Sequence, residues 1–403
     1  MNDTESATVR RTIYFYSHTG SVSGAEIVLL SILRGLDRTQ FDPVVICPDG
    51  ELVNQVHALG VRHHAMRVVT ARFSKNPIAT MGYLGELVGA VRAFRRFLRE
   101  ERPALLHANS IRAGLVASAA SRGLGFPVLW HIHDILPDHP FSAVIRRFAD
   151  RSKCTLLLAV SHATAKSFKF VAGKQVVHKE VSVVYNSVDL ERFQPDANAR
   201  QSVRTELGLR EQDVAVGTIA QITPRKRQLE LVQAFASARA SMPNVKLLIV
   251  GEAQFHAKNQ EYAQRLRQAV EQANAGDQIQ LLGRRSDVPA VVNAVDVVMQ
   301  FPEHEPLGLS LMEALACAKP CVASAVDGTP EVVQDGIDGI LSDVKDIDAL
   351  IANLRRLTDD AKLRERMGEA GRNSMQLRFS SREQMRHMHA LYNRLIPDKA
   401  GNS

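Results

Sequence analysis

Short apolar runs alternate with longer amphipathic stretches along almost the whole chain, and this alternation limits the fold more than any other feature. The stretches between the runs are long enough for helices that cross from one parallel strand to the next. The pattern predicts an α/β fold of two Rossmann-like domains, each with a doubly wound parallel sheet, facing a central cleft. The expected strands lie at residues 12–16, 43–47, 104–107, 128–131, 154–160 and 181–185, and again at residues 214–219, 245–250, 278–282, 295–299 and 320–324.

The length of the chain also favours two domains. A chain of 403 residues is long for a single domain, and a polar, charged segment at residues 198–209 separates the two sets of runs. We take this segment as the linker region. The N-terminal domain is therefore expected over residues 1–198 and the C-terminal domain over residues 199–379. A terminal segment, residues 380–403, begins with an amphipathic helix.

No targeting or membrane-spanning segment is expected. The first twelve residues are polar and mixed in charge, and no run approaches the roughly 18 to 20 apolar residues that span a bilayer. The four cysteines are scattered and form no Cys-x-x-Cys pair, which is typical of free thiols in a reducing compartment. We expect a cytoplasmic protein, with attachment to the inner face of a membrane as an open alternative.

The net positive charge of the chain comes entirely from its first half. Residues 1–198 carry 24 Lys and Arg against 17 Asp and Glu, whereas residues 199–403 carry 26 of each. This asymmetry indicates an anionic partner, such as a membrane surface or a phosphorylated acceptor. No nucleic-acid-binding module accompanies the charge, so no nucleic-acid partner is expected. The basic amphipathic stretch at residues 86–100 fits docking on anionic lipid or a core-covering helix with a solvated arginine face.

The most informative segment is residues 301–314, which follows an expected strand and is predicted to open a helix with Pro306 in its first turn. Glu305 would lie at the mouth of that helix and Glu313 about two turns along it. Eight positions return to within roughly 80° around a helix, so both carboxylates can border one cleft. The alternative is that Glu305 only favours the helix dipole and Glu313 lies on a solvated face.

Several blocks of the chain resemble glycosyltransferase family 4, whose members are retaining enzymes of the two-domain GT-B fold. The resemblance runs in family order through almost the whole chain. Its blocks are Gly24-Ala-Glu26, His131-Ile-His133-Asp134, Tyr185-Asn-Ser-Val-Asp189, Pro224-Arg-Lys226, Glu305-x7-Glu313, Gly328-Thr-Pro-Glu331 and Asp335-Gly336-x-x-Gly339. The resemblance also implies that the terminal helix packs back on the N-terminal domain.

The resemblance assigns donor-binding roles in the second half. Glu313 takes the position of the glutamate that binds the ribose hydroxyls, which suits a carboxylate because it can accept two hydrogen bonds. Glu305 contacts the donor sugar, together with the backbone amides of Gly308 and Leu309. Lys226 takes the position of the phosphate-binding lysine, although a basic cluster is usually a solvated surface. Gln221 stands where the family usually has arginine, so neutralisation of the phosphates rests more heavily on Lys226.

In the first half, the resemblance places Gly24 against the diphosphate and His133 against the transferred sugar. Ser23 and Glu26 also fit a capping box that starts a helix, which is compatible with the ligand role. A His-x-His pair can bind a metal, but no third ligand at a suitable spacing and no Asp-x-Asp motif stand out. We therefore expect no metal and no cofactor besides the nucleotide-sugar substrate.

These features predict a retaining glycosyltransferase that moves a sugar from a nucleoside-diphosphate donor to an acceptor hydroxyl. A saccharide or lipid-linked acceptor in bacterial surface polysaccharide or glycolipid synthesis suits the basic half. Glu305, His133 and Lys226 are the expected catalytic residues. Two alternatives stay open at this point: a nucleotide-sugar epimerase of the same fold, and a non-catalytic subunit that binds a nucleotide sugar.

Overall fold

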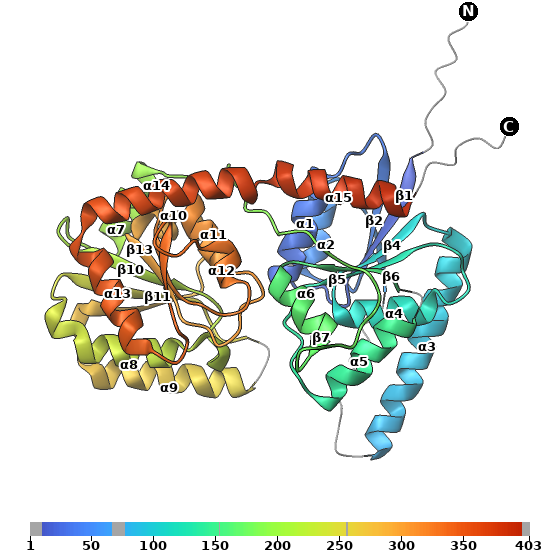
Figure 1. Ribbon diagram of the computed structural model, residues 1–403, viewed down its shortest axis with the longest axis horizontal. Coiled ribbons are helices and arrows are strands. Elements are labelled where there is room, and N and C mark those ends of the chain that lie inside the picture. Colours follow the sequence, from blue (N-terminus) through green and yellow to red (C-terminus); the bar gives the residue numbers. More distant parts are fainter. Residues whose placement is uncertain (1–9, 67–76, 153, 255–256, 397–403) are drawn as a thin grey trace, which may run out of the picture. The chain divides into compact units, whose positions relative to one another are not determined.

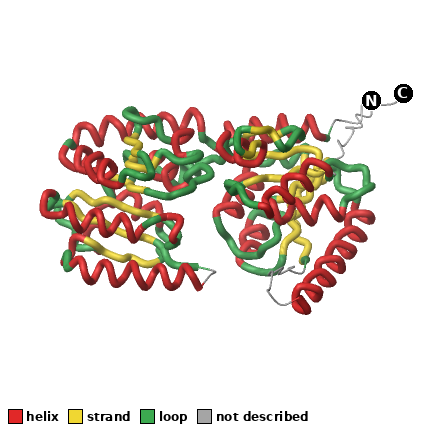
Figure 2. The backbone as a smooth tube through the Cα atoms, turned by 60° about the horizontal axis from the view of Figure 1, so that its bottom comes forward, coloured by secondary structure: helices red, strands yellow, loops and turns green. Residues whose placement is uncertain are grey.

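The computed structural model describes residues 10–66, 77–152, 154–254 and 257–396. The chain forms two compact units (Figure 1). Unit 1 comprises residues 1–185 and 382–403, and unit 2 comprises residues 186–381. In each unit helices cover both faces of a central sheet (Figure 2). The fold class predicted from the alternating pattern is therefore confirmed.

The sheet of unit 1 has seven parallel strands in the order β3-β2-β1-β4-β5-β6-β9. Its strands are β1 (Arg11–Tyr16), β2 (Phe41–Cys47), β3 (Arg62–Ala65), β4 (Leu105–Ala108), β5 (Val128–Ile132), β6 (Cys154–Ala159) and β9 (Val181–Val183). A separate small hairpin joins β7 (Phe170–Val171) to β8 (Lys174–Gln175). The helices are α1 (Gly24–Gly35), α2 (Glu51–Ala58), α3 (Pro77–Glu101), α4 (Ile111–Ala120), α5 (Pro140–Arg151), α6 (His162–Lys169) and α15 (Ser381–Leu395).

Side chains of β1 alternate between two helical layers, as the pleat of a strand requires. Tyr16 packs against Phe94 of α3, with their ring centroids 4.8 Å apart. Phe15, the residue before Tyr16, faces Tyr392 of α15 on the other side of the sheet, with their ring centroids 6.4 Å apart. The apolar residues of β1 therefore hold α3 and α15 on opposite faces of one sheet.

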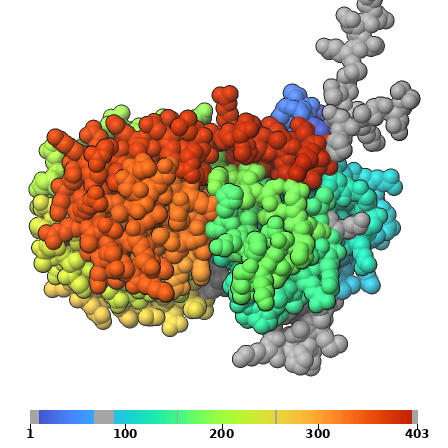
Figure 3. Space-filling view, in the orientation of Figure 1, coloured from blue at the N-terminus to red at the C-terminus, as the bar shows by residue number. Residues whose placement is uncertain are grey.

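Helix α15 is part of unit 1 although it ends the described chain. The Tyr392 hydroxyl is hydrogen-bonded to His107 Nδ1 at 2.8 Å, and Arg11 donates to the carbonyl of Ile396 at 2.8 Å. Tyr392 is fully buried, so the helix completes the core of this unit. Figure 3 shows its residues as part of the surface of unit 1.

Helix α3 contains the basic stretch for which two interpretations were open. The side chains of residues 77–87, in the first part of α3, lie outside the described part of the chain. Beyond them Phe94 and Leu98 are buried in the core, and Arg95 donates to the carbonyl of Ala120 at the end of α4. Phe94 and Leu98 thus cover the sheet, whereas Val88 is 46% exposed, and the arginines of α3 form a solvated or helix-capping face.

Unit 2 has a sheet of six parallel strands in the order β12-β11-β10-β13-β14-β15. Its strands are β10 (Val214–Ile219), β11 (Val245–Val250), β12 (Ile279–Gly283), β13 (Val297–Gln300), β14 (Cys321–Ser324) and β15 (Gly339–Ser342). The helices are α7 (Ala197–Glu206), α8 (Gln228–Ala238), α9 (Ala257–Ala273), α10 (Val288–Ala294), α11 (Leu309–Ala316), α12 (Thr329–Val332), α13 (Ile347–Asp359) and α14 (Ala361–Arg378), with short 3-10 turns η1 (Pro224–Lys226), η2 (Arg239–Ser241) and η3 (Gly276–Gln278).

The segment taken as a linker is helical instead. Residues 198–209 lie mostly in α7, which belongs to unit 2. Arg200 Nη2 bonds Asp296 at 2.6 Å, and Arg204 donates to the carbonyl of Ala294 at 3.1 Å. Guanidinium groups make these contacts of the helix with unit 2. Its sequence therefore does not need the apolar periodicity that marks most packed helices. Because these bonds hold α7 on unit 2, the division between the units falls at residues 185 and 186 and not at 198 and 199.

Both sheets share a strand order in which the direction of winding reverses at one point. The reversal lies between β1 and β4 in unit 1 and between β10 and β13 in unit 2. In sheets of this kind ligands bind beyond the carboxyl ends of the strands at the reversal. The loops after these four strands are therefore where functional residues are expected. Within the described residues, no helix has the length and apolar character needed to cross a bilayer.

Candidate functional site

In unit 2, the loops after the two strands at the reversal bring together Lys226 and Glu305. Lys226 follows β10 in the turn η1, and Glu305 follows β13. Lys226 Nζ forms an ion pair with Glu305 Oε2. Only 11% of the lysine side chain and 12% of the glutamate side chain are exposed. Two groups 79 residues apart in the sequence thus meet in a largely dry environment.

Backbone and side-chain hydrogen bonds join the same two loops. Arg225 Nη1 donates to the carbonyl of His304, and the Glu303 amide donates to the carbonyl of Arg225 at 2.9 Å. The guanidinium of Arg225 is therefore used to hold the loop of Glu305. For Arg225 to replace the arginine that the family usually has at position 221, its bond to the carbonyl of His304 would have to break.

The loop after β14 supports Glu305 from a third direction. Asp327 Oδ2 accepts from the Glu305 amide and from His304 Nδ1, each at 3.0 Å. The Gly328 amide donates to the Glu305 carbonyl at 2.9 Å. A Cβ atom at Gly328 would lie 2.1 Å from the carbonyl oxygen of Pro306, so only glycine fits this close approach. Three loops thus fix the glutamate backbone.

Helix α11 begins at Leu309, with Gly308 as its N-cap. The prediction that Pro306 lies in the first helical turn is therefore wrong, and the angular relation drawn between Glu305 and Glu313 does not apply, because Glu305 lies in the preceding loop. Gly308 has a φ of +104°, a conformation that side chains disfavour. This backbone lets the chain turn from the Glu305 loop into a helix whose first amides have no intrahelical partner.

Glu313 lies on α11 among buried neighbours. Burial raises the pKa of its carboxyl to about 7, against the opposing charge of Arg192. A carboxyl group in this range changes its charge near neutral pH. It can accept two hydrogen bonds from a vicinal diol only when it is ionised.

Gln221 lies in the loop after β10, the same loop that carries Lys226, and is half-buried. Its carbonyl accepts from Gln228 Nε2 at 2.9 Å, which ties the loop to the start of α8. Among the described residues its side-chain amide has no hydrogen-bond partner. An uncharged donor therefore occupies the position at which the family usually has a cation.

In unit 1, the start of α1 has the predicted capping box. The Ser23 amide and hydroxyl both donate to Glu26 Oε2, at 3.3 and 2.5 Å. The other oxygen of Glu26 accepts from Ser17 Oγ at 3.1 Å, at the end of β1. Gly24 is the exposed first residue of α1, beside this cap. The buried Glu26 therefore fixes the loop that carries Gly24.

His133 lies beyond the carboxyl end of β5, and Asn109 beyond that of β4. Asn109 Nδ2 donates to the carbonyl of Ala25 at 3.1 Å, and a carbonyl can only accept. Asn109 Oδ1 must then be the atom that faces His133 Nε2, at 3.2 Å, so this nitrogen carries a proton. Burial lowers the pKa of His133 to about 3. The imidazole is therefore neutral, and its Nδ1 is an acceptor.

A buried chain of polar rings continues from His133 into the core. His131 and His133 have ring centroids 4.1 Å apart, and His131 Nδ1 lies 3.2 Å from His107 Nε2. His107 is in turn hydrogen-bonded to Tyr392 of α15. Burial lowers the pKa of His107 to about 3, and that of His131 lies well below its usual value. These imidazoles are neutral. In the part of the chain that is described, no three His, Cys, Asp or Glu side chains are arranged to hold a metal ion.

The predicted site residues thus fall into two groups, one in each unit. Asn109 and Asp327 were not predicted, although each orients a predicted residue. Their positions just after β4 and β14 were the available signal, because loops after parallel strands form one edge of a sheet. The predicted residues of unit 2 are Gln221, Lys226, Glu305, Gly308, Leu309 and Glu313, and those of unit 1 are Gly24 and His133.

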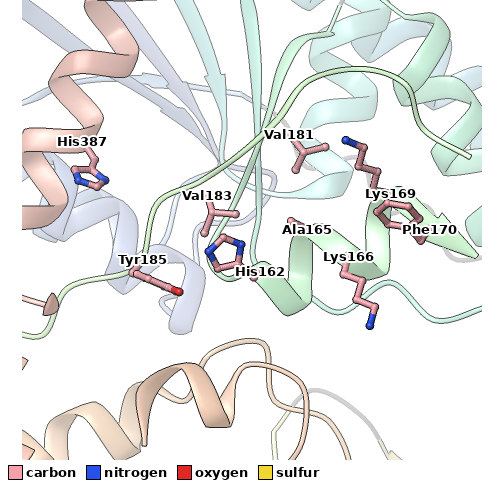
Figure 4. Close-up of a pocket in the computed structure, with 9 residues that line it drawn as sticks. All are labelled: His162, Ala165, Lys166, Lys169, Phe170, Val181, Val183, Tyr185 and His387. Atoms are coloured by element: carbon pink, nitrogen blue, oxygen red, sulfur yellow. The ribbon is translucent and has the colours of Figure 1, made fainter. Parts of the chain in front are cut away.

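A hollow of about 510 Å³ lies at the β9 edge of the unit 1 sheet (Figure 4). Its lining combines apolar, aromatic and basic side chains, and it includes none of the predicted site residues. Tyr185 and His162 lie at the end of the hollow where β9 and α6 meet the carboxyl edge of the sheet. The lining residues are His162, Ala165, Lys166, Lys169, Phe170, Val181, Val183, Tyr185 and His387.

Two family models match the chain, one in each half. The model described as Glycosyltransferase Family 4 matches residues 22–192, and the model described as Glycosyl transferases group 1 matches residues 199–374. Together they span most of both units. They cover the blocks from which the resemblance was drawn.

Curated relatives include named glycosyltransferases. The chain is 25% identical over 354 residues to the UDP-Gal:alpha-D-GlcNAc-diphosphoundecaprenol alpha-1,3-galactosyltransferase of Escherichia coli, covering 85% of this chain and 86% of that one. It is 30% identical over 221 residues to the N-acetyl-alpha-D-glucosaminyl L-malate synthase of Bacillus anthracis, a match that covers 55% of each chain. Neither relative is an epimerase, and neither supports the two alternative functions.

Solved structures show the same fold. Anabaena HepE in complex with UDP-glucose matches with a TM-score of 0.81 at 24% identity, covering 95% of this chain and 99% of that one. WaaG, a glycosyltransferase involved in lipopolysaccharide biosynthesis, matches with a TM-score of 0.70 at 14% identity, covering 96% and 100%. The predicted GT-B fold of two Rossmann-like units is confirmed.

Proposed function

This chain belongs to glycosyltransferase family 4, and we propose that it transfers a sugar from a nucleoside-diphosphate donor to an acceptor hydroxyl with retention at the anomeric carbon. The observation that carries the proposal is the buried pair of Lys226 and Glu305 at the strand reversal of unit 2. A lysine held in a dry site beside free helical amides suits a diphosphate leaving group.

In the proposed reaction, the bond between the anomeric carbon and the diphosphate oxygen breaks while the acceptor oxygen bonds to that carbon from the same face. The acceptor proton leaves with the departing diphosphate. Lys226 stabilises the negative charge that develops on the leaving group. Glu305 neutralises Lys226 before the donor binds, and then accepts from sugar hydroxyls together with the amides of Gly308 and Leu309. Glu313 accepts the ribose hydroxyls, and we propose no metal in these steps.

In unit 1, we assign Gly24 to the diphosphate and His133 to a hydroxyl of the transferred sugar. A neutral imidazole with Nδ1 as acceptor is suited to bind a hydroxyl without adding charge beside the reacting carbon. The geometry that supports this role is the hydrogen bond between His133 Nε2 and Asn109 Oδ1.

The acceptor is proposed to be a saccharide on a lipid diphosphate, used at the inner face of the membrane. The Escherichia coli relative is named for such an acceptor, N-acetylglucosamine on diphosphoundecaprenol. The positive charge of residues 1–198 favours a phosphorylated substrate. The hollow at β9 offers Tyr185 for stacking on a sugar and Lys166 and Lys169 for phosphate. Its His162 end opens at the same sheet edge as His133, because His162 follows β6 and β6 lies next to β5.

The test is a thermal-shift panel of uridine, guanosine and adenosine diphosphate sugars, followed by turnover with bacterial lipid extracts. We expect one nucleotide class to stabilise the protein and its sugar to appear on a lipid-linked product. Proton NMR of that product should give the same anomeric configuration as the donor. Nucleotide binding without turnover on any acceptor would favour the non-catalytic alternative, and an altered sugar nucleotide released without acceptor would favour an epimerase.

A further inference from the structure

Helix α5 has three large apolar side chains on its solvent face. Phe141, Val144 and Phe148 are 55%, 66% and 37% exposed. They are three and seven positions apart, so they form one stripe within about 60° around the helix. Figure 1 shows α5 on the outside of unit 1, in the same layer as α3 and α4. A contiguous apolar stripe of this kind is unusual for a face that meets only water.

The opposite face of α5 is firmly attached to unit 1. Arg146 is buried, and its Nη2 donates to the carbonyls of Leu136 and Ser167 at 3.0 and 2.7 Å. Asp150, the only acidic residue within the helix, accepts from the amides of residues 178 and 179. The helix therefore cannot turn its stripe inward without breaking these bonds.

Arginines border the apolar stripe on one side. Arg147 and Arg151 follow it on α5, and Arg122 lies across a hollow of about 820 Å³ at the end of α4. Within the described residues none of these three guanidinium groups has a carboxylate partner. Arg95 of α3 donates to the carbonyl of Arg122 and brings a fourth positive charge to the same region. The surface defined by α5 and Arg122 is thus apolar and cationic together.

We propose that this surface, made of the α5 stripe and its bordering arginines, docks on the anionic headgroups of a lipid bilayer. Apolar side chains enter the headgroup boundary while arginines bind lipid phosphates, and this is the pattern of interfacial helices. Among the described side chains of α3, Phe94 and Leu98 are buried and Val88 is the one large apolar residue that is exposed, so this part of the helix has no comparable stripe. The inference goes beyond the proposed function, although a lipid-linked acceptor would be met at such a surface.

The chain carries its own reporter for this docking. Trp130 is the only tryptophan, and its ring is stacked on Phe148 with centroids 6.3 Å apart. Trp130 is fully buried beneath the proposed surface. Lipids with brominated acyl chains quench tryptophan emission only at short range. Quenching on vesicle binding would therefore locate α5 at the bilayer.

The experiment measures binding of the full chain to vesicles of phosphatidylcholine with and without phosphatidylglycerol, in the absence of donor and acceptor. We expect salt-sensitive binding to the anionic vesicles, with quenching of Trp130 when their acyl chains are brominated. Phe141→Ser/Val144→Ser and Arg147→Glu/Arg151→Glu should each weaken binding on the order of tenfold. These side chains are exposed, so the unfolding temperature should not change.

Matched controls remove the same kinds of group elsewhere. Ile337→Ser/Leu377→Ser removes exposed apolar side chains of unit 2, and Lys362→Glu/Arg366→Glu reverses exposed charges on α14. Both should bind as the wild type does. Failure of the wild type to bind anionic vesicles at low salt would overturn the proposal, as would loss of binding in Arg92→Glu/Arg96→Glu of α3 with the α5 variants unaffected. Nucleotide-induced thermal shifts, measured separately, report the proposed function and do not depend on vesicle binding.

Discussion

The two units have the same strand order at their centres, yet the residues beyond the carboxyl ends of these central strands differ in charge. Unit 2 presents an ion pair, Lys226 with Glu305, held by bonds among three loops. Unit 1 presents a neutral imidazole, His133, oriented by an amide. One fold thus supports two kinds of polar chemistry, and the loops decide which of them each unit carries.

Burial has opposite consequences in the two regions. In unit 2 a lysine and a glutamate are buried together, so two opposite charges lie side by side as an ion pair. In unit 1 three histidines are desolvated near one another, and burial lowers the pKa of each. A charged site is suited to a diphosphate, and a neutral site to sugar hydroxyls. The predictions below test this division of labour.

The largest effect is expected for Lys226→Ala. Without the ammonium group, the charge that develops on the leaving diphosphate is not neutralised, because Gln221 carries no charge. We expect kcat/KM to fall by a factor of about 10² or more, measured as release of nucleoside diphosphate. Lys226→Arg should keep part of the activity because it keeps a cation.

The unpaired Glu305 in Lys226→Ala will also lower the unfolding temperature, since a buried charge without its partner is costly. Activity must therefore be measured at a temperature where the variant is folded. Lys258→Ala, an exposed lysine on α9, is the matched control and should behave as the wild type does. Wild-type activity in a folded Lys226→Ala variant would remove the ion pair from the proposed mechanism.

A smaller loss of activity is expected for Asn109→Asp in unit 1, where Asn109 orients the neutral imidazole of His133. An aspartate beside Nε2 stabilises the imidazolium form of His133, which places a proton on Nδ1 and turns an acceptor into a donor. We expect kcat to fall about tenfold near pH 7, the loss of roughly one hydrogen bond. Activity should recover at higher pH, where the imidazolium loses its proton again.

Nitrogen-15 NMR of the histidine rings separates this effect from a structural one. In the wild type, His133 should show a protonated Nε2 and an unprotonated Nδ1 across pH 6 to 8. Asn109→Ala should lower stability as well, because it removes the bond to the carbonyl of Ala25, but it should leave His133 neutral. A wild-type spectrum with the proton on Nδ1 would contradict the assigned tautomer.

Much of the fold could be predicted from the sequence, because buried parallel strands are continuous apolar runs. In the two large sheets, the strands that were missed, β3 and β15, lie at the edges. The sequence of β3 is Arg-His-His-Ala, and three of its four side chains are exposed. Helix α7 was taken for a linker because its buried contacts are made by Arg200 and Arg204. Polar attachment leaves no periodic apolar signal.

Within the site, the sequence could indicate candidate residues in the loops after the expected strands but not how these loops are held together. Lys226 and Glu305 follow adjacent strands, so their proximity follows from the strand order. The start of α11 at Leu309 depends on bonds from Asp327 and Gly328, which arise from a different loop. Asn109 was missed because its role depends on the carbonyl of Ala25, far away in sequence. Such bonds belong to the tertiary structure.

The smallest effect concerns Glu313, the group of unit 2 that changes charge near neutrality. Because burial raises the pKa of its carboxyl to about 7, most of it is protonated at pH 6 and ionised at pH 8. Only the ionised form accepts from both ribose hydroxyls, so the KM for the donor should fall a few-fold as pH rises through this range. Glu313→Gln should bind weakly and lose this pH dependence. The 2′,3′-dideoxy form of the same nucleotide lacks the diol. Its binding to the wild type should therefore also be independent of pH. A wild-type KM that does not change with pH would mean that Glu313 is already ionised at pH 6, and that the predicted site residues of unit 2 keep a fixed charge across this range.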